Sequence, residues 1–410
     1  MGGTIPPRPG WSGRLRDVSE LPRMVVDAAG VDEITGAARA AGRCALDTEF
    51  LWEKSYAPQL CLVQVAVGET IWLVDPLAGA PLEPLGELIA DASVQKLMHA
   101  PSADLIAFSL HFGSVPANVY DTQVAAGFVG LTASASLDRL LDGVLKVRLN
   151  HNETFSDWSR RPLKATQLEY AADDVRYLAP LVDELERRLA ERNRDGWAHA
   201  EIERRFCTSE AAGGDPERAY RKVQRRGKLS PQAQAVLVDV AAWREQLARR
   251  RDQPSGWVMK DPTLVEIARA TPRTVEDLQQ IRGLGKSLGE RESGELLAAV
   301  ARGLEREPPA IERSVPQRIA RQVDAVATLA VPMARIRCQD ADLAPELVAN
   351  RADLDRFLEA VVAGEDPSAL PLGQGWRKEL LGDILIRLVA GEISLSLNQS
   401  APFLNVEERC

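Results

Sequence analysis

The sequence predicts a mixed α/β domain in the first half of the chain and helices throughout the second half. Between residues 22 and 207, short apolar runs typical of buried strands alternate with amphipathic segments typical of helices. Strand signals nearly disappear after residue 228, and the proline-bearing segment REPPAIERSVPQ divides the remaining helical sequence. We therefore expect an N-terminal tail (1–21), the α/β domain (22–207), a basic linker entering a helix (208–228), a helical bundle (229–305), a linker (306–317), a second helical bundle (318–400) and a C-terminal tail (401–410).

The strands of the α/β domain are expected in three apolar stretches. RCALDTEFLW indicates a buried strand, and QLCLVQVAVGETIWLVDP indicates two strands around a turn at Gly68. VQKLMHA is a further short strand. Helices are expected in SADLIAFSLHFG, which should end at Gly113, and then in DTQVAAGFVG and SLDRLLDGVL.

A longer helix is predicted from about Thr166 to Asn193, with a bend at Pro180. Thr166 and Glu169 form a T-x-x-E pattern, which predicts a capping box at the start of this helix.

Composition excludes several classes of protein. The chain has 410 residues, and 45% of them are hydrophobic and 27% charged, which is typical of globular proteins with a sizeable core. No apolar run reaches the roughly 18 residues of a membrane span, and the first residues lack the apolar core of a secretory signal. The five cysteines form no CxxC pair, which argues against a zinc ribbon or a disulfide framework. We expect a cytoplasmic protein without a membrane partner.

Charge leaves nucleic-acid binding open. The net charge of −9 is unfavourable for binding phosphates, but the segment RAYRKVQRRGK, residues 218–228, is basic throughout.

Asp47 and Glu49 form a pair of acids in the strand LDTEF. Residues i and i+2 of a strand point to the same face, so the two carboxylates converge. Most such triplets are surface charges or caps, but a strand this apolar should not bury two acids without compensation. A divalent metal ion would compensate them, and ligands that are all oxygen favour Mg²⁺ or Mn²⁺ over zinc.

Two further acids complete the candidate site. Asp104 opens the helix that follows the KLMHA strand. In the stretch LEYAADDVRYLAP, a helical wheel puts Asp174 at the edge of the apolar stripe, one turn from Tyr170, and puts Asp173 almost opposite the stripe. We select Asp174 as the functional acid and expect Asp173 to be solvated. Four acids from three elements suggest two metal ions about 3.5–4 Å apart.

With these residues in place, the chain resembles ribonuclease D, of the DEDD superfamily of 3′→5′ exonucleases. The segments that carry the resemblance follow one another in family order: LDTEF, YAPQLCLVQ, LVDPL, HAPSADL, YDTQVAAGFVG and SDWSRRPLKATQLEYAADDVRYLAPL. The resemblance implies a ribonuclease H-like α/β fold. It also implies that the two helical bundles are HRDC domains, with the first (LSPQAQAVLVDVAAWREQ onward) the better match.

The resemblance also implies a role for each site residue. Asp47 would bridge both metal ions, and Glu49 would bind the ion that activates water. Asp104 would hold the other ion through water, and Asp174 matches the last acidic motif. Tyr170 matches the tyrosine that positions the attacking water. The histidine-type branch would need a histidine where this chain has Glu169, so the tyrosine-type branch is expected.

The remaining motif residues have two interpretations each. Asp121 either caps a helix or contacts substrate, while His99 is expected to be structural. Trp158, Arg160 and Arg161 either contact substrate phosphate or pair locally. Gln59 and Gln64 either pack in the sheet or contact substrate, and the glycine turn IRGLGK, with Gly283, Gly285 and Lys286, either meets phosphate or only joins helices.

The implied function is a 3′→5′ exoribonuclease that uses two divalent ions and releases nucleoside 5′-monophosphates. The implied partners are RNAs with 3′ extensions, namely tRNA precursors and other small structured RNAs, and we expect a monomer. Two alternatives stay open at this stage: a DNA 3′→5′ exonuclease in repair, and a catalytically silent RNA-binding protein.

Overall fold

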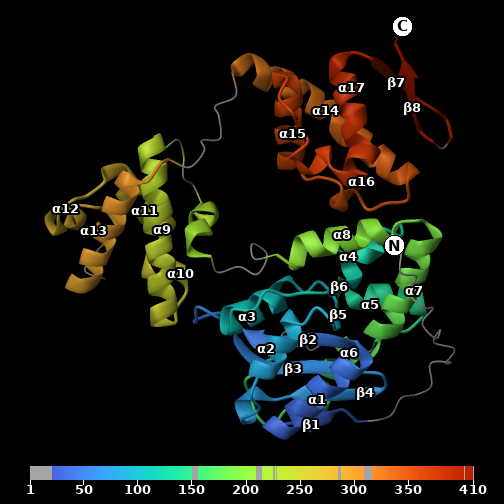
Figure 1. Ribbon diagram of the computed structural model, residues 1–410, viewed down its shortest axis with the longest axis vertical. Helices are drawn as coiled ribbons and strands as arrows, with labels where there is room; N and C mark the ends of the chain where they lie inside the picture. The colour runs from blue at the N-terminus through green and yellow to red at the C-terminus, as the bar shows by residue number, and fades with distance from the viewer. Residues whose placement is uncertain are drawn as a thin grey trace.

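A computed structural model describes residues 21–149, 156–208, 215–224, 227, 229–284, 288–308, 316–400 and 402–409. Figure 1 shows a sheet-containing domain, a helical unit beside it and a C-terminal unit that lies against α8. In the described ranges, no helix is both long and apolar enough to cross a membrane.

One mixed sheet of six strands organises the first half of the described chain. Its order is β1-β4-β3-β2-β5-β6; β2 pairs antiparallel with β3 and parallel with β5. The strand bounds are β1 Arg23–Val25, β2 Arg43–Leu51, β3 Gln59–Val67, β4 Thr70–Val74, β5 Gln95–Met98 and β6 Val119–Asp121. The strands predicted from the apolar runs are therefore confirmed, including the turn at Gly68.

Eight helices accompany this sheet among the described residues. Their bounds are α1 Ala28–Ala41, α2 Glu83–Ala90, α3 Ser102–Phe112, α4 Thr122–Gly127, α5 Leu137–Leu140, α6 Ala165–Arg176, α7 Leu178–Glu191 and α8 Asp195–Phe206. The helix α3 ends as predicted at Gly113, whose φ of 67° suits a residue without a Cβ. The helix α6 packs across β2, β3 and β4, so its side chains can meet those of the central strands.

Two details of the predicted long helix are wrong. The helix begins at Ala165, close to the predicted start, but its capping residue is not Thr166: Gln167, not Glu169, accepts a hydrogen bond of 3.0 Å from the backbone N–H of Lys164. It is also interrupted at Tyr177, before Pro180, so that α6 and α7 are separate helices. A proline ring clashes with the carbonyl four residues earlier, and that carbonyl belongs to Arg176, the last residue of α6.

The first helical unit has a hydrophobic core of its own. It contains α9 Pro231–Arg251, α10 Ser255–Val258, α11 Asp261–Ala270, α12 Val275–Gln279 and α13 Glu290–Glu305. A short 3-10 helix, Pro216–Lys222, precedes them and contributes Ala219 to this core, as does the following Val223. This part of the predicted basic linker therefore packs with the helices. The sheet domain contributes Tyr56, from the loop between β2 and β3.

The C-terminal unit contains a β-hairpin as well as helices, so the prediction of an all-helical second half is wrong. After α14 Gln317–Asp340, α15 Arg351–Ala363, α16 Gly375–Arg377 and α17 Asp383–Ala390, strand β7 Ile393–Leu397 pairs antiparallel with β8 Leu404–Glu408. The segment predicted to be a tail thus supplies a strand. Ile393 and Leu404 are buried, and this burial fixes the hairpin against the helices.

The C-terminal unit shares one continuous hydrophobic core with the sheet domain. Trp376 stacks on Trp197 of α8 with ring centroids 5.7 Å apart and meets the edge of Phe128 at 5.1 Å. The backbone of Gly127 approaches closely here, since its carbonyl accepts a 2.8 Å hydrogen bond from Ala344 and an added Cβ would lie 2.7 Å from Leu347.

Candidate active site

Three of the predicted acids meet where α6 crosses β2. Asp47 and Glu49 come from β2 and Asp174 comes from α6, and one carboxylate oxygen from each lies within 4.8 Å of the others. All three side chains are half-buried, so the cluster is surrounded by protein on one side and open to solvent on the other. The structure therefore brings together residues more than 120 positions apart in the chain, as the convergence of LDTEF and the last motif predicted.

Among the described residues, no basic side chain appears among the causes of the pKa shifts in this cluster. Burial raises the pKa of Asp47 well above its usual range, and the charges of Asp104, Asp174 and Glu49 raise it further. Burial, followed by repulsion from Asp174 and Asp104, raises the pKa of Glu49 to about 8. The pKa of Asp174 is also raised to about 8, by burial and then by Asp173 and Asp104. The charged groups that cause these shifts are all carboxylates.

Such a set of ligands fits a hard divalent cation. Several carboxylates held at this spacing repel one another unless protons or a cation neutralise them. Oxygen ligands are the ones that Mg²⁺ and similar ions prefer, and the group contains neither a cysteine nor a histidine that would favour zinc. The cluster therefore has the chemistry of a divalent-metal site.

Asp104 lies beside this cluster and is more deeply buried than its members. It is in the first turn of α3 and is 8% exposed, and the hydroxyl of Thr48 donates a hydrogen bond to its Oδ1. Burial raises the pKa of Asp104 despite that hydrogen bond. Asp104 is not among the three residues whose oxygens lie within 4.8 Å of one another, but its charge raises the pKa of Asp47, Glu49 and Asp174.

Asp173 is not solvated, so this part of the prediction is wrong. Its side chain is buried, and Arg176 lies 3.1 Å away, one turn along α6. The helical wheel identified the face of α6 that meets the sheet, but α6 is covered on more than one side, since the polar Gln167 is buried as well. The two neighbouring acids differ in their partners: Asp173 pairs with an arginine, while Asp174 faces other acids.

Tyr170 is one turn before Asp174 on α6, as expected from the spacing of four residues. Its ring packs against Trp158, with centroids 6.0 Å apart, and Trp158 is buried. The motif residue Trp158 therefore supports the ring of Tyr170.

Several of the other motif residues have structural partners. His99 Nδ1 is 2.9 Å from the hydroxyl of Thr122, and burial lowers the pKa of His99 to about 4, so the ring is neutral and structural as predicted. Asp121 accepts hydrogen bonds of 2.9 Å from the backbone N–H groups of Ala100 and Gln123, so it caps α4.

The arginines of the SDWSRRPL segment form ion pairs with nearby aspartates of the same domain. Arg161 forms a bidentate pair with Asp75 at 2.5 and 2.7 Å, and Arg160 lies 2.9 Å from Asp157. Of the two interpretations for these arginines, the structure favours local ion pairs.

Gln64, for which the sequence left open packing in the sheet or contact with substrate, lies next to the acidic cluster. It is fully buried in β3, directly opposite Asp47 in the antiparallel pair. Residues in this relation share one face of the sheet. Neither amide atom of Gln64 has a hydrogen-bond partner among the described residues, which is costly for a buried group. Its place opposite Asp47 depends on a bulge between Glu49 and Phe50, which the sequence pattern does not reveal.

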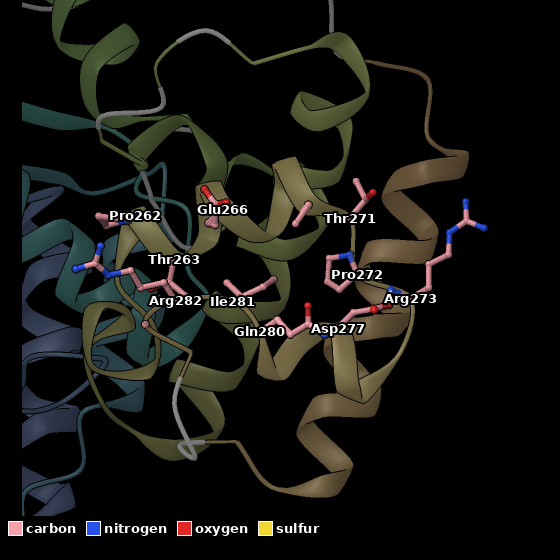
Figure 2. Close-up of a pocket in the computed structure, with 12 residues that line it drawn as sticks. Pro262, Thr263, Glu266, Thr271, Pro272, Arg273, Asp277, Gln280, Ile281 and Arg282 are labelled. Atoms are coloured by element: carbon pink, nitrogen blue, oxygen red, sulfur yellow. Dashed lines mark hydrogen bonds between the residues drawn. The ribbon is translucent and has the colours of Figure 1, made fainter.

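A pocket of about 1000 Å³ lies in the first helical unit, away from the acidic cluster. Arg282 and Arg273 lie at opposite ends of it (Figure 2), and Glu266 and Asp277 also line it, so its charge is balanced. Gly283, at φ 90°, belongs to this pocket, but Gly285 and Lys286 of the same turn are outside the described residues. Phosphate binding by that turn stays a prediction.

Comparison with known proteins assigns a family to the sheet domain and to the first helical unit. A model of the 3′-5′ exonuclease family matches residues 22–190, and a model of the HRDC domain matches residues 233–300. Ribonuclease D of Granulibacter bethesdensis is 36% identical over 365 residues, covering 86% of this chain and 89% of that protein. Ribonuclease D of Zymomonas mobilis is 32% identical over 394 residues, covering 94% and 98%. The chain belongs to the ribonuclease D family.

The structural comparison agrees with this assignment. The crystal structure of Escherichia coli RNase D matches with a TM-score of 0.72 and 30% identity, covering 90% of this chain and 99% of that one. As a member of the ribonuclease D family, the chain is a 3′→5′ exoribonuclease, and RNA is its substrate. The fold prediction is confirmed for an exonuclease domain with a mixed sheet and for an HRDC domain that follows it.

Proposed function

We propose that this chain removes nucleotides from RNA 3′ ends by two-metal-ion catalysis at the acidic cluster and releases nucleoside 5′-monophosphates. One observation carries the proposal: three carboxylates with raised pKa values meet within 4.8 Å, with a fourth beside them and a tyrosine one helical turn away. An enzyme that holds hard divalent ions needs such an uncompensated set of oxygen ligands.

The four acids divide the binding of two ions, Mg²⁺ or Mn²⁺, between them. Asp47, Glu49 and Asp174 would hold the ions directly, with Asp47 shared between them, and Asp104 would hold one of them through water. When bound, the ions supply a nucleophile at neutral pH and neutralise charge on the scissile phosphate. The rigid elements on which these acids lie, β2, α3 and α6, keep the carboxylates in place.

Tyr170 orients the attacking water. Its hydroxyl need not lose a proton, because it has only to hold the water in line with the scissile bond. Packing on Trp158 fixes the ring, so the hydroxyl position is set before substrate binds. We expect Tyr170→Phe to reduce kcat by about 100-fold with little change in RNA affinity, measured by single-turnover cleavage and by filter binding.

The substrates we propose are tRNA precursors and other small structured RNAs with 3′ extensions. The E. coli relative is described as an exoribonuclease involved in structured RNA processing, which supports this class. The HRDC domain and residues 318–400, which we propose as a second HRDC-like domain, would hold the folded body of the RNA. We further propose that the protein works as a monomer in the cytoplasm, where the four free cysteines of the described residues stay reduced.

The proposal is tested by incubating the protein with a labelled, 3′-extended tRNA and Mg²⁺ or Mn²⁺. We expect stepwise shortening from the 3′ end, release of 5′-monophosphates, and no reaction with EDTA or with Asp47→Asn. A DNA oligonucleotide of the same sequence should be cut more slowly, because it lacks the 2′-hydroxyl. Full activity in EDTA or in Asp47→Asn would overturn the metal mechanism.

A further inference from the structure

Two exposed tryptophans flank the contact between the exonuclease domain and the first helical unit. Trp52 directly follows β2 and is 45% exposed, and Trp257 lies in α10 and is 63% exposed. The catalytic mechanism uses neither of them. Large aromatic side chains left in solvent commonly mark binding surfaces, because covering them is favourable.

A single carboxylate ties the two segments together. On α9, Glu245 accepts a 2.8 Å hydrogen bond at Oε1 from the hydroxyl of Tyr56 and another of 2.8 Å at Oε2 from the hydroxyl of Ser255. Tyr56 is four residues after Trp52, and Ser255 is two residues before Trp257. The backbone N–H of Tyr56 also donates to Asp252 Oδ1 at 3.1 Å. Both tryptophans are therefore attached, from different domains, to one end of α9.

The Trp52 ring is already oriented. Its indole N–H donates a 3.2 Å hydrogen bond to the backbone carbonyl of Tyr56, and the ring of Phe50 meets it edge-on with centroids 6.5 Å apart. The edge of the indole is thus held, and part of its surface stays accessible. A ring held in this way loses little conformational entropy when a planar group stacks on it.

The position and the nearby charges indicate what binds there. Trp52 lies three residues after Glu49, just beyond the end of β2, which is about 10 Å along an extended chain, so this residue is near the acidic cluster. Exposed lysines, Lys54 and Lys260, follow the two tryptophans within three residues. Aromatic rings interspersed with basic groups are the usual surface for unpaired nucleotides, since each base offers a flat face and each linkage a negative charge.

We propose that Trp52 and Trp257 form a stacking site for the unpaired 3′ segment of the RNA substrate as it enters the active site. This inference rests on the proposed function and adds a binding subsite to it. The contact of Tyr56 and Ser255 with Glu245 keeps the two rings at a fixed separation, so that the first helical unit and the exonuclease domain bind the same RNA tail.

The test compares two substrates in the full-length protein: a hairpin RNA with six unpaired 3′ nucleotides and an RNA dinucleotide. In Trp52→Ala and Trp257→Ala we expect KM for the tailed hairpin to rise about tenfold relative to KM for the dinucleotide. Trp52→Phe and Trp257→Phe should restore most of the affinity, because a ring remains. Leu329→Ala, which removes an exposed apolar side chain of α14, is the matched control and should leave both KM values unchanged.

The outcomes separate the two hypotheses. Absence of RNA cleavage by the unsubstituted protein would contradict the proposed function itself. Normal cleavage with unchanged KM ratios in both alanine variants would overturn only the stacking site. Because both tryptophans are exposed, the melting temperatures of the variants should match that of the unsubstituted protein. Quenching of tryptophan fluorescence by oligouridylate, a direct measure of stacking, should be weaker in the alanine variants.

Discussion

The surroundings of the carboxylate on α8 and of those in the acidic cluster are opposite. On α8, Glu201 is almost completely buried, and Arg204, Arg205 and Arg377 lie 2.9, 2.6 and 2.8 Å from its oxygens. Burial by itself would raise the pKa of Glu201, but the hydrogen bond from Arg204 and the charges of Arg377 and Arg205 lower it. At the acidic cluster, burial and like charges act together, and the pKa values rise.

The difference separates a structural acid from functional ones. Glu201 is neutralised by the chain itself, and its partner Arg377 belongs to the C-terminal unit, so the ion pair joins two parts of the protein. In the part of the chain that the structure describes, Asp47, Glu49 and Asp174 face other acids, and their charge is left for a bound cation to neutralise. A group of partly buried acids that face one another is therefore a better sign of a metal site than burial alone.

The largest effect should distinguish the two neighbouring acids of α6. We expect Asp174→Asn to lower the rate of RNA hydrolysis on the order of 1000-fold, because a metal ligand is lost, while the protein stays folded. Asp173→Asn should keep the rate within about tenfold but lower the free energy of unfolding by about 2 kcal/mol, because it weakens a buried pair with Arg176. Single-turnover rates and urea unfolding measure both. The reverse pattern would show that Asp173 is the ligand.

The next effect concerns the acid that the chain neutralises. Glu201→Gln should lower the free energy of unfolding by about 3 kcal/mol, because Arg377 would be left buried without its charge partner. Glu203→Gln, an exposed change two residues away on α8, is the matched control and should cost less than about 0.5 kcal/mol. Hydrolysis of a dinucleotide by the folded protein should be unaffected in both. Equal urea midpoints for the two variants would mean that Glu201 is not a structural acid.

A smaller effect is expected from the buried amide opposite Asp47. Gln64→Leu should raise the free energy of unfolding by about 1 kcal/mol, since an unpaired polar group is replaced by an apolar one of similar size. It should also slow hydrolysis by about tenfold, because the polar amide that lies opposite Asp47 in the sheet would be lost. Gln59→Leu, at the exposed start of the same strand, should do neither. A gain in stability without a loss of rate would make Gln64 a packing residue.

The smallest effect is a change of melting temperature with pH and metal. Glu49 and Asp174 have pKa values of about 8 in the folded protein and about 4 in unfolded chains. Between pH 4 and 8 the folded state thus binds more protons than the unfolded state, so metal-free stability should fall as pH rises through this window. The pKa of Glu201 is lowered, so its ionised form stabilises the folded state at neutral pH. This contribution to the free energy of unfolding is lost only in acid, as Glu201 becomes protonated below its ordinary pKa.

Scanning calorimetry measures this effect. In EDTA we expect the melting temperature to be a few degrees lower at pH 8 than at pH 6, and addition of Mg²⁺ at pH 8 should restore it. Asp174→Asn should reduce the dependence on both pH and Mg²⁺. A metal-free melting temperature that rises from pH 6 to pH 8 by the same amount in both proteins would show that the cluster is not electrostatically strained.

The sequence predicted the parts of the fold that depend on local pattern. The alternation in LDTEF, the stop at Gly113 and the spacing of Tyr170 and Asp174 all follow from neighbours in the chain, and the structure places these residues accordingly. The burial of Asp173 could not be predicted, because it depends on what covers the far side of α6. The hairpin of β7 and β8 was missed because its five-residue strands are stabilised by packing on distant helices.

The continuous core between the sheet domain and the C-terminal unit has a consequence for engineering the chain. Truncation after α8 would uncover Phe128, Trp197 and the arginine-paired Glu201, and the nuclease would be left with an apolar face that promotes aggregation. Excision of residues 215–308, with a short bridge in their place, would leave this face covered and would expose Tyr56, Ala57 and Leu110. Residues 215–308 are therefore the part of the chain that can be exchanged for another domain. Such a replacement would be a route to nucleases with altered preference among RNAs.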